Sequence, residues 1–501
     1  MSGSSHDQAS NATVPWLEWS RDAFERAADA RRPVLLNIGA SWCHGCAVME
    51  QTTYARPDIV QAIVQRTVPI KVDADRRPDL NDRYNLDGWP TTALLTPSGE
   101  ILTGTTYATP DLMLRMVGET ADALQERYDD LMTRAAAAAT ARRQTPPPNR
   151  YNVDTTAPDW VSNQIREQFD SEHGGFGIGG KFLHLGPLRF ALAHYAATRE
   201  DALGDIVRRS LTSLLASPMI DDVDGGVFRY AAARDWSRPH TEKMLEDQVG
   251  MASLLLDAAG VFDVSDWVGR ARDIMRFVER TLCDRTRGGF YASQRADDDY
   301  HGVSGSIRRT MEAPVVDTTL FTDLNAQAAV AWLRAGAVLD DVEPGRLGLV
   351  SLERVLLSGY RPGEGVAHFV ARRGEVRGLL TDHVHTAWAL LDFDEATGNE
   401  TYGMLAEELM RSAVRTLWDP VSGGFVDRQP DADDIGLLAD PLKPLGLNCL
   451  AARTLHRLAA RTGQQDLEQL AQDALASQTG VYRAQGIGGA PYAMAVLELA
   501  E

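Results

Sequence analysis

Two hydrophobic patterns divide the chain. Short apolar runs of buried-strand type alternate with helically spaced segments up to about residue 143, and only helical spacing follows. In the first part the predicted elements are helices at 22–30, from 47 onward, at 58–65 and at 110–143, and strands at 33–39, 68–72, 93–96 and 101–104. A strand, a helix and a strand at this spacing require a parallel pair. The last two strands flank a Pro-Ser-Gly turn and predict an antiparallel hairpin.

Glycine pairs interrupt the helical part of the chain at recurring intervals. They stand at 174–175, 225–226, 288–289, 423–424 and 488–489, with Gly363 and Gly365 in the long gap. About twelve helices lie between these points, and repeats of this length are typical of stacked helical units. Six helical hairpins returning on themselves predict an (α/α)₆ toroid. Its glycine turns and the starts of its even-numbered helices share one end.

The predicted organisation follows from these patterns. We expect a disordered N-terminus at 1–14, an α/β domain at 15–144, a proline-rich linker at 145–150 and the all-α toroid at 151–501. The formal net charge of −20 argues against nucleic acid and anionic membranes as partners. We find no apolar run near the ~20 residues of a membrane span and no signal-peptide core. Four cysteines fit a reducing compartment, so we expect a cytoplasmic protein.

The clearest chemistry is the pair Cys43 and Cys46, where a strand hands over to a helix. Helix N-terminal amides stabilise an anion, and the pKa of a Cys-x-x-Cys thiol there falls from about 8.5 to roughly 3.5 to 7.5. We therefore expect Cys43 to be the nucleophile and Cys46 to resolve the mixed disulfide, with His44 tuning the couple. A purely structural disulfide and half of a zinc site are the alternatives. Cys283 and Cys449 lie far apart in sequence, so we expect no metal and no cofactor.

The first part resembles the thioredoxin fold, in which a cis-proline before the third strand faces the Cys-x-x-Cys pair. Pro90 holds that place, and an ordinary turn proline is the alternative. In thioredoxins a buried aspartate lies six residues before the nucleophile. Asn37 stands there and cannot carry a proton, so help for Cys46 must come from elsewhere. Trp42 completes the expected redox site.

Polar residues gather at the starts of the even-numbered helices, at the expected mouth of the toroid. The candidate cavity residues are Lys181, His184, Arg229, Trp236, His240, Glu242, Lys243, Asp247, Asp323, Asn325, Asp382, His383, His385 and Asn448. A cleft lined by such groups is the usual form of a ligand site. Asp, Asn and Thr at helix starts often only cap the helix, so this alternative stays open for Asp323 and Asp382.

Together these motifs resemble the family of thioredoxin-domain proteins related to spermatogenesis-associated protein 20. The resemblance covers nearly the whole chain and is carried by SWCHGCAVME at 41–50, IKVDADRRPDL at 70–80, DGWPTTALLTPSG at 87–99, HGGFGIGGKF at 173–182 and FRYAAARDWSRPHTEKMLEDQ at 228–248. It implies a thioredoxin-like domain joined to a six-hairpin toroid. The chain departs from the family at Gly45, where tryptophan is usual, and at Leu324, Thr381–His383 and Leu447.

Three functions fit these patterns. The first is a thiol-disulfide oxidoreductase, in which Cys43 and Cys46 do the chemistry and the toroid binds a disulfide- or thiol-bearing substrate or partner. The second is a carbohydrate-active enzyme, because such toroids resemble those of glycosidases and sugar 2-epimerases, with carboxylate or histidine pairs as acid and base. The third is a redox-regulated scaffold. We favour the first, because only the cysteine pair has a complete local mechanism.

Overall fold

The computed structural model describes residues 13–144, 151–371 and 376–500. It divides the chain into two compact units. The N-terminal unit comprises Met1–Pro146 together with Pro430–Pro441, and the toroid unit comprises Pro147–Gln429 and Leu442–Glu501. The residues expected to be disordered, up to residue 12, and the predicted linker at 145–150 lie outside the described residues.

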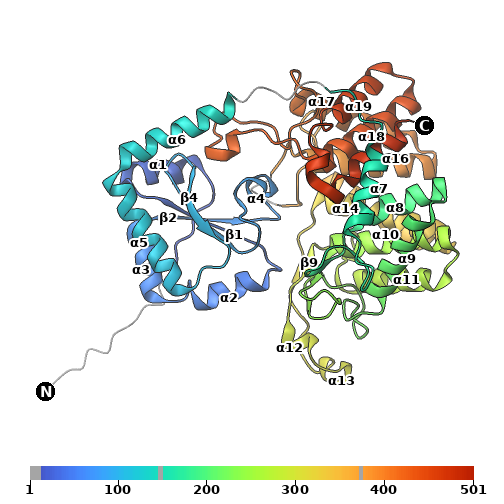
Figure 1. Cartoon of the computed structure of the whole chain (residues 1–501), viewed down its shortest axis with the longest axis horizontal. Helices are drawn as coiled ribbons and strands as arrows, with labels where there is room; N and C mark the ends of the chain where they lie inside the picture. The colour runs from blue at the N-terminus through green and yellow to red at the C-terminus, as the bar shows by residue number, and fades with distance from the viewer. Residues whose placement is uncertain (1–12, 145–150, 372–375, 501) are drawn as a thin grey trace. The chain divides into compact units, whose positions relative to one another are not determined.

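A four-stranded sheet in the order β2-β1-β3-β4 forms the centre of the N-terminal unit (Figure 1). Its strands are β1 (Val34–Gly39), β2 (Val68–Asp73), β3 (Thr91–Leu95) and β4 (Ile101–Thr105). The β1 and β2 strands are parallel, as the βαβ pattern predicts, and β3 is antiparallel to β1 and β4. The helices of this unit are α1 (Arg21–Ala30), α2 (His44–Thr52), α3 (Pro57–Arg66), α4 (Pro78–Tyr84), α5 (Pro110–Glu126) and α6 (Tyr128–Arg143).

Two features of this unit differ from the sequence analysis. The single helix expected at 110–143 is two helices, because the backbone leaves helical geometry at Arg127 with φ −128° and ψ 34°. The helix α4 was not predicted, since it is short and mostly polar. It begins at a proline, which suits the first turn of a helix.

The segment Pro430–Pro441 packs into the N-terminal unit although the sequence analysis assigned it to the toroid. We call it the strap. Leu438 of the strap is buried in the core that contains Tyr84. The Tyr84 hydroxyl accepts a hydrogen bond from the Leu437 amide at 2.9 Å and donates one to the Gly99 carbonyl at 2.7 Å. Arg83 donates to the Asp440 carbonyl at 2.8 Å.

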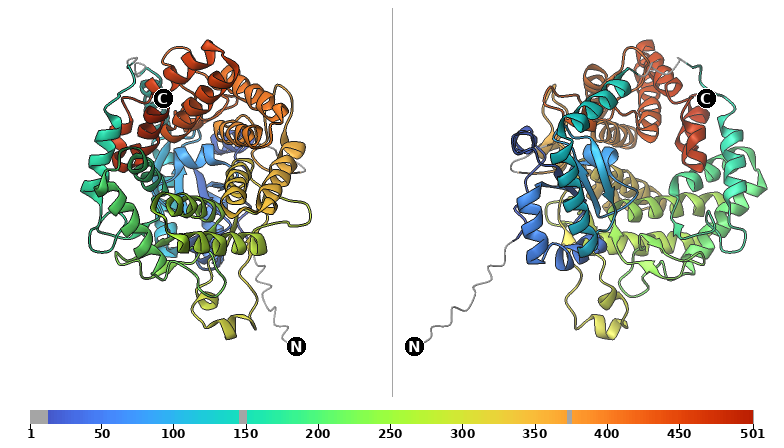
Figure 2. Two further views of the ribbon diagram at one scale, coloured as in Figure 1. Left: turned by 90° about the vertical axis from the view of Figure 1, so that its right-hand side faces the viewer. Right: turned by 60° about the vertical axis from the view of Figure 1, so that its left-hand side comes forward.

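The toroid unit is a ring of paired helices, as predicted (Figure 2, left). In the described residues six inner helices form a closed cycle, because each packs on the next and the last packs on the first. The inner helices are α8 (Leu185–Thr198), α10 (Leu245–Phe262), α14 (Thr322–Leu339), α16 (Leu380–Thr397), α18 (Leu445–Thr462) and α20 (Ala490–Glu498). The outer helices are α7 (Ala157–Gln168), α9 (Asp201–Leu215), α11 (Ser265–Thr281), α15 (Val342–Gly359), α17 (Glu400–Leu417) and α19 (Gln465–Ala476).

Two small three-stranded sheets lie in the loops that lead to the inner helices. They consist of β5 (Lys181–Phe182), β6 (Tyr230–Ala231) and β7 (Pro239–His240), and of β8 (Lys243–Met244), β9 (Ser293–Gln294) and β10 (Val316–Asp317). Each strand has two residues, which is too short for a strand period to show in the sequence. Two further short helices, α12 (Asp298–His301) and α13 (Gly305–Arg308), lie between β9 and β10.

Candidate functional site

Cys43 and Cys46 are joined in a disulfide at the start of α2, with their Cα atoms 5.3 Å apart. Cys43 is the N-cap residue of α2, and its Sγ accepts a hydrogen bond from the Cys46 amide at 3.1 Å. An N-terminal amide and the helix dipole both favour negative charge at this position. The Cys43 side chain is 4% exposed, whereas Cys46 is half-buried and His44 is exposed.

The bond between Trp89 and Pro90 is cis, as the thioredoxin resemblance implies. Pro90 lies beside the cysteine pair, because a Cβ added to Gly45 would lie 3.2 Å from the proline Cδ. The absence of a side chain at Gly45 therefore leaves room for the proline loop. Trp42 is fixed by a hydrogen bond from its indole to Asp75 at 2.8 Å, and its ring packs edge-on against Trp89 at 5.4 Å.

Asn37 lies in the middle of β1 and is buried. Its amide donates to the Tyr54 hydroxyl at 3.0 Å. Burial raises the pKa of Tyr54. Neither residue can therefore take a proton from Cys46 near neutral pH.

In the toroid, the structure places Lys181 and Lys243 inside glycine turns. Both side chains are fully buried. Lys181 Nζ contacts Asp170 Oδ2 at 2.7 Å and donates to the Gly177 carbonyl at 2.8 Å. Lys243 Nζ makes the same pair of contacts with Asp221 and the Gly225 carbonyl. These lysines hold the turns and are not free to meet a ligand, so we leave them out of the site.

Asn325 and Asn448 also bind the glycine turns. Each is the fourth residue of its inner helix and pairs with both backbone groups of the phenylalanine that follows the glycine pair, namely Phe290 and Phe425. His383 holds the same position in α16, where its Nδ1 donates to the Leu379 carbonyl at 2.8 Å. Asn325 and Asn448 therefore anchor their turns, and His383 packs against the fourth turn at Gly365, where an added Cβ would meet its Nε2. We leave these three residues out of the site.

Trp236 and His184 support the loops around the first turn. The Trp236 indole donates to the His173 carbonyl at 3.0 Å, and its ring fills the space above Gly175, where a Cβ would lie 2.6 Å from the ring. His184 packs edge-on against Phe176. Burial and the charge of Lys181 lower the pKa of His184, which keeps the ring neutral.

His240 belongs to an aromatic stack on the β5-β6-β7 sheet. Its ring lies 4.0 Å from the Tyr230 ring at an interplanar angle of 13°, and Tyr230 stacks on Phe182 at 4.9 Å and 12°. Phe182 is 49% exposed, so one end of the stack is open. Nearby, Glu242 is buried, and its Oε2 has no hydrogen-bond partner in the part of the chain that the structure describes.

The starts of α10, α14 and α16 bring acids together with Arg229 and His385. Burial and the charge of Glu246 raise the pKa of Asp247 to about 8, and Arg229 opposes this shift. The crowded surroundings of Glu246 and the charge of Asp323 likewise raise its pKa, although the Glu246 side chain is exposed to solvent. Burial lowers the pKa of His385, although the charge of Asp323 acts the other way. A protonated carboxyl beside neutral imidazole is an arrangement suited to acid-base chemistry.

The structure adds His368, which the sequence analysis missed. This residue is buried, and its Nδ1 lies 3.0 and 3.1 Å from the two carboxylate oxygens of Asp382. Asp323 completes a group whose potential ligand atoms all lie within 4.8 Å of one another. His368 precedes α16 in the loop after the glycines of the fourth turn. A histidine at that place was the only signal that the sequence offered.

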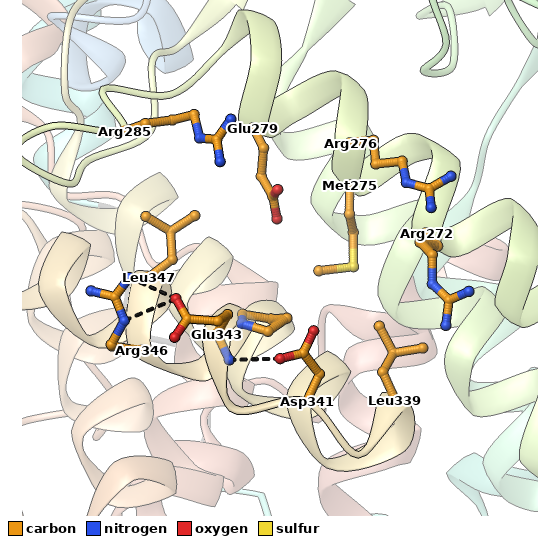
Figure 3. A pocket seen from close by; sticks show the side chains of 11 residues that line it. Arg272, Met275, Arg276, Glu279, Arg285, Leu339, Asp341, Glu343, Arg346 and Leu347 are labelled. Carbon is orange, nitrogen blue, oxygen red and sulfur yellow. Dashed lines mark hydrogen bonds and ion pairs between the residues drawn. The ribbon is translucent and has the colours of Figure 1, made fainter.

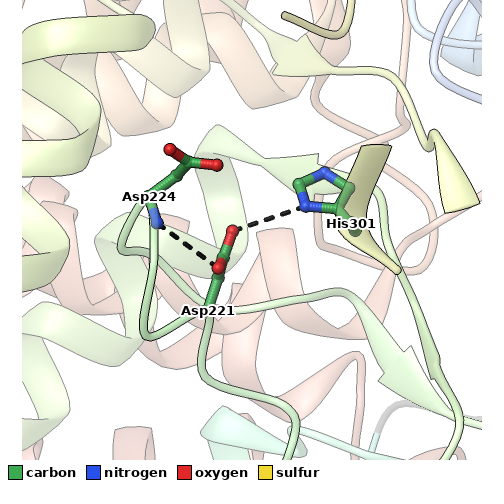
Figure 4. A group of neighbouring side chains, drawn as sticks. All are labelled: Asp221, Asp224 and His301. Carbon is green, nitrogen blue, oxygen red and sulfur yellow. Dashed lines mark hydrogen bonds and ion pairs between the residues drawn. The ribbon is translucent and has the colours of Figure 1, made fainter. Parts of the chain in front are cut away.

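A second group of the same composition consists of Asp221, Asp224 and His301 (Figure 4). Here Lys243 lies 2.7 Å from Asp221, and Arg308 contacts Asp221 at 2.8 Å and Asp224 at 3.0 Å. Two fixed cations therefore balance the two carboxylates. This group holds the segment with α12 and α13 against the second glycine turn.

A pocket of about 400 Å³ lies between α11 and the start of α15 (Figure 3). Its floor is formed by Met275, Leu339 and Leu347, and charged side chains surround it. The acids there are already engaged, since Glu343 pairs with Arg346 at 2.7 Å and Asp341 caps α15. None of the residues predicted to form the functional site lines this pocket.

Residues 4–143 match the family model Thioredox_DsbH, which is described as a protein of unknown function, DUF255. This match covers nearly all of the N-terminal unit apart from the strap. A shorter match, 36% identical over 70 residues, links 13% of the chain with 12% of the thiol:disulfide interchange protein DsbD 2 of Pseudomonas aeruginosa. None of the helices in the described residues is long and apolar enough to cross a membrane.

The resemblance to spermatogenesis-associated protein 20 is confirmed, but over little more than half of the chain, whereas the sequence analysis expected it over nearly the whole chain. The human protein of that name is 29% identical over 312 residues, which are 57% of this chain. The match spans 39% of the length of that relative, so the chain corresponds to less than half of it.

Solved structures confirm the toroid fold. A sugar epimerase from a ruminal bacterium matches 65% of the chain and 85% of its own, with a TM-score of 0.54 and 13% identity. A GH76 alpha-mannanase from Bacteroides thetaiotaomicron matches 69% of the chain and 95% of its own, with a TM-score of 0.50 and 11% identity. At these identities the likeness extends to the fold alone.

Proposed function

We propose that the protein is a thiol-disulfide oxidoreductase whose chemistry takes place at Cys43 and Cys46. The observation that carries the proposal is the position of Cys43 as N-cap of α2, where its sulfur accepts the Cys46 amide. The Thioredox_DsbH domain and the short similarity to a thiol:disulfide interchange protein support it.

In the reducing direction, the Cys43 thiolate attacks one sulfur of a substrate disulfide. A mixed disulfide forms, and the other substrate sulfur leaves as a thiolate that takes up a proton. The Cys46 thiol then loses its proton, attacks Cys43 Sγ and releases the first substrate sulfur. The substrate gains two electrons, and the cysteine pair ends as the disulfide. The opposite direction runs the same steps backwards.

The remaining parts of the proposal concern the toroid and the compartment. The toroid binds the thiol- or disulfide-bearing substrate or partner, and the aromatic stack of Phe182, Tyr230 and His240 supplies an open surface for it. The low number of cysteines in the chain supports a cytoplasmic location.

The test is the reduction potential of the cysteine pair, measured by equilibrating the full chain with glutathione and counting free thiols by mass spectrometry. We expect a two-electron couple between about −270 and −120 mV, the range of known thioredoxin-like proteins. The variant His44→Ala should shift it, since His44 is exposed next to Cys43. A pair that stays fully reduced or fully oxidised across every glutathione ratio would refute the proposal.

A trapping experiment separates the roles of the two cysteines. Cys46→Ser should accumulate a mixed disulfide at Cys43 with a model disulfide peptide, because the resolving sulfur is gone. Cys43→Ser is the matched control and should trap nothing. If Cys43→Ser instead trapped the peptide at Cys46, the roles of the two cysteines would be reversed. This outcome needs a test because the Cys43 side chain is buried.

A carbohydrate-active toroid is the second candidate. It is supported by the carboxyls of Glu246 and Asp247, whose pKa values are raised, and by the open aromatic stack beside His240. If a screen of sugars finds a substrate, the double variant Cys43→Ser/Cys46→Ser should turn it over as fast as the wild type does. The variant Asp247→Asn should lose this turnover. If turnover disappears with the cysteines, the toroid is not the catalytic unit.

A further inference from the structure

The two groups of two aspartates and one histidine differ in how their charge is balanced. At Asp221 and Asp224, Lys243 and Arg308 occupy the carboxylates (Figure 4). At Asp323 and Asp382, no lysine or arginine of the described ranges 13–144, 151–371 and 376–500 forms an ion pair with either carboxylate. A buried carboxylate normally has a paired cation or coordinates a metal.

Each carboxylate of the second group has only neutral or titratable contacts. Asp323 accepts hydrogen bonds from the Leu324 amide at 2.8 Å and from the Thr381 hydroxyl at 2.9 Å. Asp382 is fully buried, and its carboxylate is hydrogen-bonded to the His368 ring. The positive ends of α14 and α16 contribute about half an elementary charge each. When both carboxylates are ionised and the imidazole is neutral, the two helix ends still leave the group net negative, and burial opposes the ionisation of Asp382 by raising its pKa.

We propose that Asp323, His368 and Asp382 form a binding site for a divalent metal cation. This goes beyond the thiol chemistry, because the site uses no cysteine and lies in the toroid unit. Carboxylate and imidazole ligands lie about 2.0 to 2.2 Å from a transition metal, so ligand atoms on one ion are roughly 3 to 4 Å apart. The 3.0 Å from His368 Nδ1 to Asp382 Oδ1 fits this geometry. The ligand atoms of the whole group lie within 4.8 Å of one another, so a small adjustment of the side chains would bring all three onto one ion.

The composition of the group indicates which metal it takes. Two carboxylates and one imidazole are a hard oxygen set with one nitrogen, which suits Mn²⁺ and Zn²⁺ more than the thiolate-preferring ions. The Thr381 hydroxyl, bonded to Asp323, orients that carboxylate as outer-shell partners of metal ligands do. Three protein ligands leave positions on the ion for water or for an oxygen of a substrate, as in metal sites with an open position.

The experiment uses the full chain, stripped of metal with a chelator and kept oxidised so that Cys43 and Cys46 offer no thiolate. Titration with Mn²⁺ alone, followed by calorimetry and by elemental analysis after gel filtration, should give one ion per chain. Asp323→Asn and Asp382→Asn should each weaken binding at least tenfold. Asp224→Asn, in the group already balanced by lysine and arginine, is the matched control and should bind as the wild type does.

A second readout needs no variant. Co²⁺ added to the stripped wild type should give visible absorption bands typical of a site with a nitrogen ligand, and Mn²⁺ or Zn²⁺ should remove them. No binding by the wild type, or binding that survives both Asp323→Asn and Asp382→Asn, would overturn the proposal. In that case His368 and Asp382 are a simple ion pair. Circular dichroism of the variants shows whether lost binding reflects lost folding.

Discussion

Asn448→Ala tests whether this residue holds the fold or serves a ligand. Asn448 Oδ1 accepts the Phe425 amide at 2.6 Å, and its Nδ2 donates to the Phe425 carbonyl at 2.9 Å and to the Pro444 carbonyl at 3.0 Å. Phe425 is fully buried, so water cannot replace the lost partner. Each buried backbone group left unpaired costs about 1 to 3 kcal/mol, which gives about 2 to 6 kcal/mol for the two groups of Phe425.

The assay is urea unfolding of the full chain, followed by far-ultraviolet circular dichroism, because helices dominate that signal. Asn163→Ala is the matched control. Asn163 is exposed on α7, and among the described residues its side chain is hydrogen-bonded to Arg166 alone, so its loss should change the unfolding free energy by less than about 0.5 kcal/mol. Asn325→Ala should repeat the large effect, since Asn325 binds Phe290 in the same way. The potential of the cysteine couple should not change. A loss below about 1 kcal/mol for Asn448→Ala would refute this account.

Three further predictions follow from other contacts. The raised pKa of Asp247, about 8, means that its protonated form favours folding and that this contribution is lost as pH rises from about 4 to 8. Asp247→Asn should therefore flatten the decline in unfolding free energy over that range, by up to about 1.4 kcal/mol per pH unit. Burial raises the pKa of Asp170, but hydrogen bonds from Arg234 and Lys181 outweigh it and hold this pKa below its usual range. The ionised carboxylate therefore stabilises the fold above pH about 4, and this stabilisation is lost in acid. Asp170→Asn should lower stability at pH 7 by about 3 to 5 kcal/mol and reduce the further loss between pH 5 and 3, as measured by urea unfolding at each pH. Gly436 has a φ of +61°, and the Cβ of Gly436→Ala would collide with the Tyr84 hydroxyl. Amide hydrogen exchange should therefore speed up across 430–441. Gly446→Ala is the control and should have no effect, because the space around Gly446 is open.

The sequence predicted most of the fold because the main elements carry strong local patterns. Strands β1 and β2 are mostly apolar, and glycine pairs mark the repeats of the toroid except the fourth, where Gly363 and Gly365 stand. The strap escaped notice because its anchoring depends on contacts distant in sequence. Leu438 stands in a short apolar run at 435–439 that shows no helical or strand period, and the residues that anchor the strap, Tyr84 and Arg83, lie more than three hundred residues earlier. No local period can reveal such a contact.

The candidate site was harder to predict, because some polar residues at helix starts bind the glycine turns while others can form a ligand site. Lys181 and Lys243 hold matching places in the first two repeats, and Asn325 and Asn448 hold matching places in α14 and α18. Each of the four binds a glycine turn. A feature that every repeat needs is structural. A ligand site has no reason to repeat, so the residues that break the pattern are the better candidates. In the sequence alone these were hidden among the repeating ones, and His368 gave no pattern at all.

The strap also bears on how the redox chemistry can be studied. A fragment ending at residue 144 would contain Cys43, Cys46 and Pro90 but would lack Leu438, which is buried in the core of the N-terminal unit. Removing a buried leucine side chain costs about 2 to 5 kcal/mol, a large share of the stability of a domain of this size. The Tyr84 hydroxyl would also lose the Leu437 amide. Because the strap leaves the toroid after α17 and returns to it before α18, the N-terminal unit is complete only when the toroid is present in the same chain. Loss of redox activity in the shorter fragment would therefore reflect an incomplete core, and only the full chain can assign the chemistry to the cysteine pair.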